Sequence, residues 1–191
     1  MYTPTGPHTH ETVVKKSRFI ATVVPVSTVE QALSSLKVFS RQDATHNCWA
    51  YRIEDAYRFS DDGEPGGTAG RPILNAIDGQ EMNNVLVLVT RYFGGIKLGT
   101  GGLVRAYGST AAQCLRTAPN EPIKDMLQVS VTIPFDAVGA FYVLLEKLGA
   151  QKLNEKYTAE GVTIKIHLEK NKKEELSSAI ADATHGTGIV H

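Results

Sequence analysis

Apolar positions in the first part of the chain switch between the spacing of strands and that of helices. Residues 19–26 (FIATVVPV) are rich in β-branched side chains and predict a strand. Residues 28–40 then carry apolar side chains at helical spacing, behind a cap at Ser27 or Thr28. Residues 46–53 (HNCWAYRI) and 57–60 (YRFS) predict two more strands, and the short turn between them indicates a hairpin.

Two helices and one strongly apolar strand are predicted next. Pro72 fits only in the first turn of a helix, and the helix that it opens carries Ile73, Leu74 and Ile77 on one face. Residues 85–89 (VLVLV) predict a strand buried on both sides. A second helix is expected to pack on the same sheet through the helically spaced residues Leu103, Tyr107, Ala111, Cys114 and Leu115.

The remaining pattern predicts a second domain. Residues 128–133 alternate as a strand, 136–148 are helical, and 152–169 read as two strands with a turn at Glu160-Gly161. A helix over 172–183 and a short strand at the end complete the order β-α-β-β-α-β, which is the ferredoxin-like arrangement. The fold class is therefore α+β with two domains.

The domain boundary is placed in residues 116–125 (RTAPNEPIKD), where two prolines among polar residues are typical of a linker. The predicted domains are 1–122 and 123–191. All eight arginines precede the boundary. Because the planar guanidinium suits phosphate, carboxylate and base stacking, a ligand surface is expected in the first domain.

Composition narrows the function classes. Twenty basic and twenty acidic side chains cancel, so no global charge draws the protein to nucleic acid or membrane, and any polyanion site must be local. No apolar run approaches the roughly 20 residues of a membrane helix. Cys48 and Cys114 form no CxxC pair, and no leader-like segment opens the chain. A cytoplasmic protein with free thiols, and no membrane partner, is expected.

Residues 59–72 (FSDDGEPGGTAGRP) gather acids, glycines and prolines ahead of a helix. The spacing of Asp61, Asp62 and Glu64 does not match a calcium loop, although a looser magnesium site with substrate phosphates stays open. The alternative is structural: the acids complement the positive end of the helix, Thr68 caps it, and the glycines permit a tight entry. Amide replacement of the acids is then expected to change stability by about 1 kcal/mol or less per site.

Residues 90–108 (TRYFGGIKLGTGGLVRAYG) follow the buried strand with a glycine-rich loop that opens a helix. Such a loop exposes backbone N–H groups that can hold an anion, and Arg91, Tyr92, Lys97 and Arg105 surround it. The phosphate motifs GxxxxGK(S/T) and GxGxxG are both absent. Two alternatives remain open: the glycines serve close packing only, or Arg91 is a structural residue paired with an acid at 61, 62 or 64.

Nucleophilic and metal sites are not predicted. His46 and Cys48 share one face of a strand, side by side, whereas a Cys-His nucleophilic pair converges across a cleft. Cys48 is expected in the core and His46 at the surface or hydrogen-bonded. His8 and His10 are expected in a disordered polar tail. The HExxH and GxSxG motifs are absent.

The first domain resembles the YigZ/IMPACT family. The resemblance rests on long motifs, which here read KKSRF, HNCWAY, FSDDGEPGGTAGRPIL and VTRYFGGIKLGTGGLVRAYG. It implies an N-terminal domain like domain 2 of ribosomal protein S5 and domain IV of elongation factor G. The second domain resembles the small C-terminal domain of bacterial members, which implies a likeness to domain V of that factor.

The resemblance also implies a function. Eukaryotic members are linked to translational control under amino-acid starvation, and for bacterial relatives ribosome or nucleic-acid binding is suggested by fold likeness. A non-enzymatic, translation-associated regulator that binds RNA or ribosome is therefore expected, with no cofactor and no catalytic or metal-binding residues. The nominated binding surface is Ser60, Asp61, Asp62, Glu64, Arg71, Arg91, Tyr92, Lys97 and Arg105, with Tyr92 or Trp49 as a stacking surface.

Two rival hypotheses use the same residues. In the first, an enzyme or binding protein acts on a small phosphorylated or carboxylated ligand, with the acids as metal or general-base groups and the arginines as an anion clamp. In the second, the protein is an interaction module of a stress-response pathway, and its arginines meet an acidic partner protein.

Overall fold

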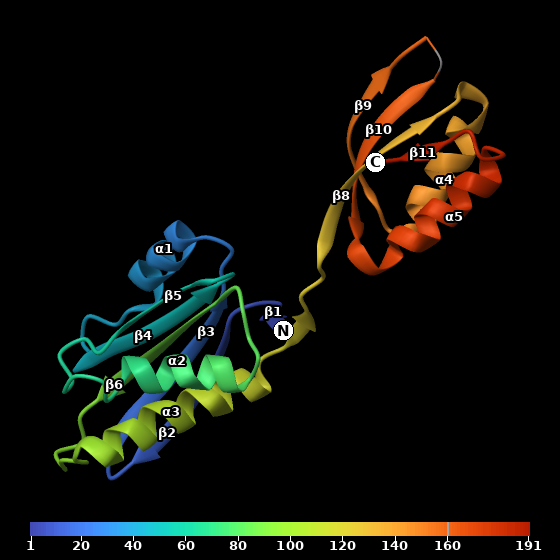
Figure 1. Ribbon diagram of the computed structural model, residues 1–191. Coiled ribbons are helices and arrows are strands. Elements are labelled where there is room, and N and C mark those ends of the chain that lie inside the picture. The colour runs from blue at the N-terminus through green and yellow to red at the C-terminus, as the bar shows by residue number, and fades with distance from the viewer. Residues whose placement is uncertain (160) are drawn as a thin grey trace. The chain divides into compact units, whose positions relative to one another are not determined.

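The computed structural model describes residues 1–159 and 161–191, in two compact units, Met1–Ile123 and Lys124–His191 (Figure 1). They are called the N-terminal and the C-terminal domain below. Among the described residues, no helix is both long enough and apolar enough to pass through a membrane.

The N-terminal domain is built on a five-stranded sheet in which every neighbouring pair of strands is antiparallel. The predicted hairpin is confirmed, and its turn places Glu54 at a φ of 52°. The predicted VLVLV strand lies at the centre of the sheet, where both of its faces are buried. In spatial order the strands are β2 (His8–Val14), β3 (Ser17–Pro25), β6 (Val85–Tyr92), β4 (His46–Ile53) and β5 (Ala56–Ser60).

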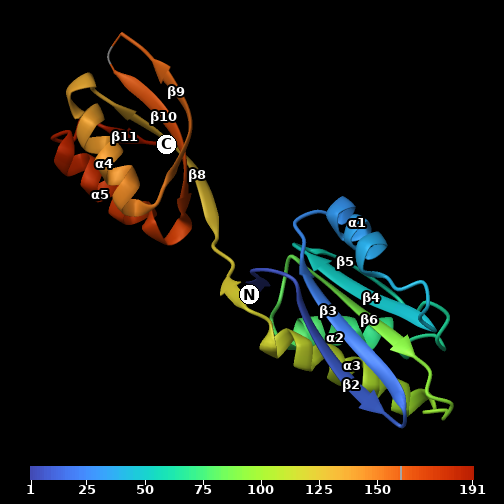
Figure 2. The same cartoon turned by 180° about the vertical axis from the view of Figure 1, so that it is seen from behind.

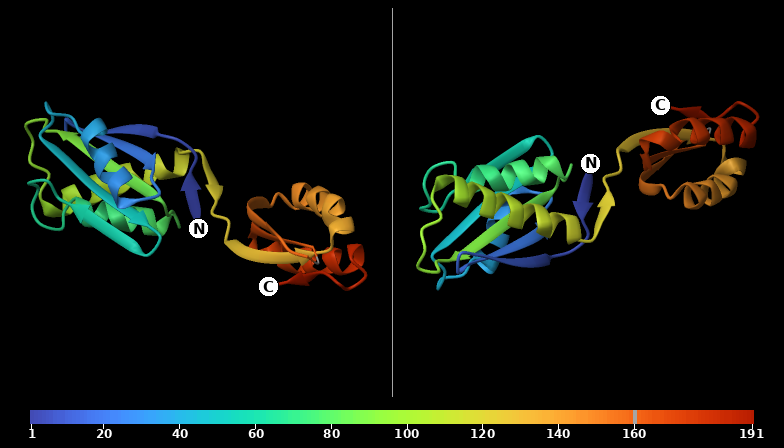
Figure 3. Two further views of the ribbon diagram at one scale, coloured as in Figure 1. Left: turned by 90° about the horizontal axis from the view of Figure 1, so that it is seen from above. Right: turned by 90° about the horizontal axis from the view of Figure 1, so that it is seen from below.

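Helices cover both faces of this sheet (Figures 1 and 3). α2 (Gly70–Gly79) and α3 (Thr100–Thr117) lie side by side on one face, and α1 (Val29–Phe39), capped by Thr28, lies on the other. Alternation along β6 explains the two cores, because Val85, Val87 and Val89 pack with α2 and α3 whereas Leu86 packs with α1. All three helices were predicted, and Pro72 lies in the first turn of α2.

The amino-terminal segment is the main correction to the sequence analysis. It is not a disordered tail, because residues 8–14 form the edge strand β2, which pairs with β3 along its whole length (Figure 2). His10 Nε2 lies 2.9 Å from Gln113 Oε1 on α3. The predicted linker is also partly structured, since β7 (Asn120–Pro122) pairs with β1 (Tyr2–Pro4).

The C-terminal domain has the predicted β-α-β-β-α-β order. Its four strands form an antiparallel sheet in the spatial order β11-β8-β10-β9, and α4 and α5 cover one face of it (Figure 1). Of the turn predicted at Glu160-Gly161, Glu160 lies outside the described residues. The elements are β8 (Met126–Ile133), η1 (Phe135–Ala137), α4 (Val138–Leu148), β9 (Gln151–Tyr157), β10 (Val162–Glu169), η2 (Lys170–Lys172), α5 (Lys173–Ala183) and β11 (Ile189–Val190).

Candidate functional site

Asp61 organises the loop between β5 and α2. Its Oδ1 accepts hydrogen bonds from the backbone N–H groups of Ala69 (2.9 Å) and Gly70 (2.8 Å), and its Oδ2 accepts one from Gly67 (2.9 Å). Partial burial pushes the pKa of Asp61 upward, but these three N–H donors outweigh it and leave the pKa below its ordinary value. Asp61 therefore caps the start of α2.

The other polar residues of this loop also bond to the backbone. Asp62 Oδ2 accepts the N–H of Asn47, and Ser60 Oγ accepts the N–H of Asp62. The predicted cap Thr68 instead donates its hydroxyl to the Pro65 carbonyl. Gly70 is required by close approach, because a Cβ there would stand 2.7 Å from the Ser60 carbonyl oxygen.

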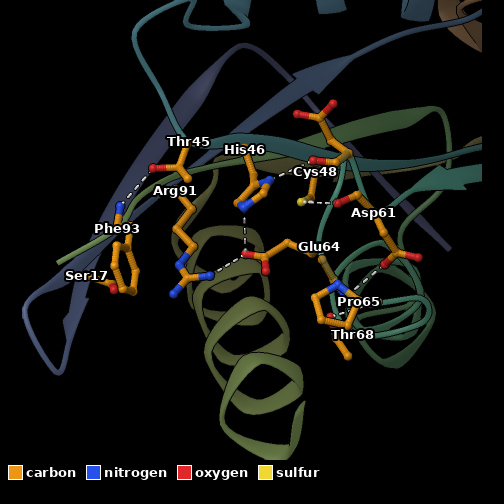
Figure 4. A network of polar contacts seen from close by, with 12 residues as sticks. Ser17, Thr45, His46, Cys48, Asp61, Glu64, Pro65, Thr68, Arg91 and Phe93 are labelled. Atoms are coloured by element: carbon orange, nitrogen blue, oxygen red, sulfur yellow. Dashed lines mark hydrogen bonds and ion pairs between the residues drawn. The ribbon is translucent and has the colours of Figure 1, made fainter. Parts of the chain in front are cut away.

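Glu64 lies apart from these acids, in a buried polar cluster (Figure 4). Its Oε1 accepts a hydrogen bond of 2.6 Å from Arg91 Nη1 and one of 2.7 Å from the Tyr107 hydroxyl. Burial, with smaller contributions from Cys48 and Glu64, raises the pKa of Tyr107 far above its ordinary value, so this hydroxyl stays a donor. The structural pairing of Arg91 with an acid, left open above, is present.

His46 completes this cluster from the neighbouring strand. It is the cross-strand partner of Arg91 in the β4–β6 register, and the two side chains share a face of the sheet. Its Nδ1 lies 2.7 Å from the Asp62 carbonyl oxygen, and because a carbonyl only accepts, Nδ1 carries a hydrogen. Its Nε2 therefore faces Glu64, 3.9 Å from Oε1.

A pocket of about 330 Å³ opens over this cluster. His46, Glu64 and Arg91 contribute to its floor, and only Nη1 of the Arg91 guanidinium has a hydrogen-bond partner among the described residues. Glu64 Oε2 accepts no hydrogen bond from them either. The rest of the wall is mostly apolar and is formed by Thr45, Pro65, Phe93, Lys97, Leu98, Gly99, Thr100 and Leu103.

The amino-terminal end of α3 lies at the edge of this pocket. Its N-cap residue Gly99 has a φ of 72°, a left-handed conformation that favours glycine, and no side chain caps the helix. Lys97 is exposed before it. The exposed Arg105 lies beside Gly101, where an added Cβ would stand 3.7 Å from Nη1. The helix end therefore presents unbonded N–H groups between two cations.

Six of the nominated residues do not line the pocket: Ser60, Asp61, Asp62, Arg71, Tyr92 and Arg105. Tyr92 is on the opposite face of β6 from Arg91, and its hydroxyl donates to Asp43. Arg71 is exposed at the start of α2, with its guanidinium 5.0 Å from the centre of the Phe59 ring. Trp49, the alternative stacking residue, stacks on Tyr51 and packs against the α1 core.

His46, Phe93 and Tyr107 belong to the site and were not nominated. Neither were the remaining residues that line the pocket, Thr45, Pro65, Leu98, Gly99, Thr100 and Leu103. The alternation of β4 placed His46 and Cys48 on one face, but the partner strand was unknown. Tyr107 was assigned to the core, where it lies, without its bond to Glu64. Phe93 follows Arg91 by two residues, and its ring centre lies 5.5 Å from that guanidinium. Knowledge that β4 pairs with β6, with His46 opposite Arg91, would have identified His46 as a site residue.

Cys48 does not form a nucleophilic site. Its thiol is fully buried, and Sγ donates to the Asp61 carbonyl at 3.0 Å. Burial raises the pKa of Cys48 to about 12, so its thiol stays protonated at neutral pH. This agrees with the expectation that Cys48 is a core residue. Among the described residues, no three His, Cys, Asp or Glu side chains gather in the way that a metal ion needs.

Fold and site together define a two-domain α+β protein whose first domain carries a pocket beside an uncapped helix end. Residues 15–115 match the family model of the Impact N-terminal domain, and residues 131–187 match a domain of unknown function (DUF1949). The chain belongs to the IMPACT family. The resemblance stated from the sequence motifs is therefore confirmed.

Relatives of the chain span both bacteria and mammals. An IMPACT family member of Thermus thermophilus is 47% identical over 82% of this chain and 86% of its own length. YigZ of Escherichia coli is 34% identical over 96% and 93%, and Protein IMPACT of Rattus norvegicus is 38% identical over 44% and 29%. A crystal structure of a hypothetical protein, 33% identical, matches 99% of this chain and 95% of its own with a TM-score of 0.74.

Proposed function

We propose that this protein is a non-enzymatic, translation-associated regulator whose N-terminal domain binds RNA, including RNA of the ribosome. The observation that carries the proposal is the uncapped amino-terminal end of α3, which lies between the exposed cations Lys97 and Arg105. Backbone N–H groups at a helix start and flanking cations are the groups that proteins use to hold phosphate.

Further positive charge lies next to this helix end. The turn between β2 and β3 brings Lys16 against Gly94, so closely that a Cβ at Gly94 would stand 2.0 Å from the Lys16 carbonyl carbon. Lys16 is exposed, as is Lys15 before it. In a chain without net charge, exposed lysines therefore lie in the turn that contacts the loop between β6 and α3, and a polyanion site requires such local positive charge.

The acids of the loop do not oppose this surface. Glu64 is neutralised by Arg91, and the carboxylates of Asp61 and Asp62 are bonded to backbone N–H groups. These bonds also weigh against the rival hypothesis of an enzyme that uses Asp61 and Asp62 as metal ligands or bases, because a metal would displace the bonds that hold the loop. A small phosphorylated or carboxylated ligand in the pocket remains the second candidate, supported by the pocket itself.

The proposal is tested by native pull-down of the full chain from lysate, with and without RNase. Ribosomal RNA is expected in the untreated sample. A K97A/R105A variant is expected to lose most of it. A control variant, K37A/R116A, removes two exposed charges, one from α1 and one from the last turn of α3, and is expected to retain it. Equal RNA yields from the two variants would contradict the proposal. Protein partners that resist RNase would instead favour the interaction module.

A further inference from the structure

The floor of the pocket offers both hydrogen-bond donors and an acceptor. Only 6% of the Arg91 side chain is exposed, and its Nη2 and Nε have no hydrogen-bond partner among the described residues. Beside it, Glu64 Oε2 is an acceptor that no described residue satisfies. Of these atoms only Nε is itself buried, whereas Nη2 and Oε2 are accessible, so a donor and an acceptor are available to a ligand in the pocket.

The Glu64 carboxylate determines which chemical group of a ligand can bind at the floor of the pocket. A phosphate only accepts hydrogen bonds, so it would leave Glu64 Oε2 without a donor, and the positive charge of Arg91 is already compensated by Glu64. Figure 4 shows the Glu64 carboxylate beside the Arg91 guanidinium. A nucleobase edge carries donors beside acceptors, so it can donate to Glu64 while it accepts from Arg91. The floor therefore favours a neutral, mixed polar edge over an anion.

The wall and the rim fit the other two parts of a nucleotide. Phe93 is 48% exposed and lines the pocket with Pro65, Leu98 and Leu103, which offers a flat apolar surface for a base. Gly99 and Thr100, at the start of α3, lie at the same pocket with Lys97 and can hold a phosphate. A volume of about 330 Å³ is at the low end of small-molecule sites, which run from about 300 to 1,000 Å³.

We infer that this pocket takes one unpaired nucleotide of an RNA strand, with its base stacked on Phe93, the polar edge of that base facing the Glu64–Arg91 pair, and its phosphate at the start of α3. The inference deepens the proposed function. It rests on that function in one respect, namely that the nucleotide belongs to an RNA strand. The fit of a nucleobase to the wall and the floor of the pocket is the same whether the nucleotide is free or part of an RNA strand.

The experiment compares ligands on the full chain by calorimetric titration. The probes are the four nucleoside 5′-monophosphates, ribose 5-phosphate, inorganic phosphate and a short single-stranded oligoribonucleotide. At least one monophosphate is expected to bind about tenfold or more tightly than ribose 5-phosphate, because one stacked base contributes that much. The oligoribonucleotide is expected to bind more tightly still. Equal binding of ribose 5-phosphate and every monophosphate would overturn the inference.

A matched pair of variants tests whether the base of the bound nucleotide contacts Phe93. F93L removes from the pocket a ring that is 48% exposed, and Y57L removes from β5 a ring that is 53% exposed. F93L is expected to lose the preference for the monophosphate over ribose 5-phosphate, and Y57L is expected to keep it. Because both side chains are about half exposed, neither change should prevent folding. The same preference in both variants would overturn the inference.

The two proposals fail in different ways. If the oligoribonucleotide binds, but no monophosphate does and F93L has no effect, the pocket inference is wrong and the proposed function stands. If a monophosphate binds in the pocket but the oligoribonucleotide does not, the proposed function is wrong, and the RNA strand is excluded as the source of the nucleotide.

Discussion

The Arg91 guanidinium and the Glu64 carboxylate form a buried ion pair in which Nη1 lies 2.6 Å from Oε1, and less than a tenth of either side chain is exposed. Twenty-seven residues separate the two along the chain. The pair joins the central strand β6 to the loop that precedes α2. It therefore fixes the position of that loop against the sheet and forms the floor of the pocket.

Loss of one partner of this pair is expected to destabilise the domain. Arg91→Ala leaves a buried carboxylate without its cation, which costs about 3–5 kcal/mol of unfolding free energy. Arg105→Ala, at an exposed position, is expected to change it by no more than about 0.5 kcal/mol. Denaturant unfolding of both variants measures the difference. An Arg91→Ala variant as stable as the parent would show that the pair is not structural.

A double variant tests whether the uncompensated charge causes this loss. R91M/E64L replaces both charges with apolar side chains, so no carboxylate is left buried alone. Replacing a buried ion pair in this way is often neutral, and the double variant is expected to be more stable than Arg91→Ala. If the double variant is instead the less stable of the two, the uncompensated charge is not the main cause, and lost packing or the Tyr107 hydroxyl left without its acceptor explains the effect.

Asp61 is expected to contribute stability that depends on pH. Its folded-state pKa is lowered, so its contribution is complete above the unfolded value of about 3.9 and is lost as the pH falls through the lower folded value. Asp61→Asn keeps one accepting oxygen but replaces the other with an NH2 group that faces an N–H donor, and it is expected to lower stability at pH 7 by about 1–2 kcal/mol. This exceeds the limit of about 1 kcal/mol expected from sequence.

The measurement is the free energy of unfolding of parent and Asp61→Asn at pH 7 and near pH 3. The gap between them is expected to narrow at the lower pH, because protonation removes the same charge from the parent. Asp55→Asn, in the exposed β4–β5 turn, is the control and should match the parent. A gap that is constant with pH would mean that the carboxylate charge is not what caps α2.

The two cysteines are expected to be unreactive in the folded protein. Burial raises the pKa of Cys48 and of Cys114 to about 12, so almost no thiolate is present at pH 8. Mass spectrometry after brief treatment with iodoacetamide should find no labelled peptide, and both cysteines should label once denaturant is added. Rapid labelling of Cys48 alone in the native protein would revive the Cys-His hypothesis.

We propose the domain boundary at residues 122 and 123, and limited proteolysis tests it. Trypsin is expected to cut first after Lys124, beyond β7 and before β8, and to leave two stable fragments. The pairing of β7 with β1 makes a cut before residue 120 less favourable than the sequence alone suggested. A first cut within residues 85–115 would contradict both the boundary and the independence of the domains.

Sequence periodicity predicted the elements whose side chains are sorted by burial. The VLVLV strand and α3 have strong patterns, because they pack against the core along their length. β2 was missed because its sequence, HTHETVV, is polar and forms an edge strand on which no residue is fully buried. Its strand conformation comes from pairing with β3, a tertiary contact that a local pattern does not contain.

The candidate site was predictable only in part. Motif and charge pointed to Glu64, Arg91 and Lys97, which do line one pocket. That Arg91 pairs with Glu64 rather than with Asp61 or Asp62 depends on the path of the loop, which follows from the backbone bonds of Asp61. His46 joins the site through strand register, which sequence alone does not fix.

Salt dependence of RNA binding tests most directly the central claim, that Lys97, Arg105 and the start of α3 hold RNA phosphate. The affinity of the full chain and of K97A/R105A for a single-stranded oligoribonucleotide is measured across a range of salt concentrations. Each lost phosphate contact is expected to reduce the slope of log affinity against log salt by about 0.7, hence about 1.4 for the variant. K37A/R116A should keep the parental slope. An unchanged slope in K97A/R105A would contradict the claim.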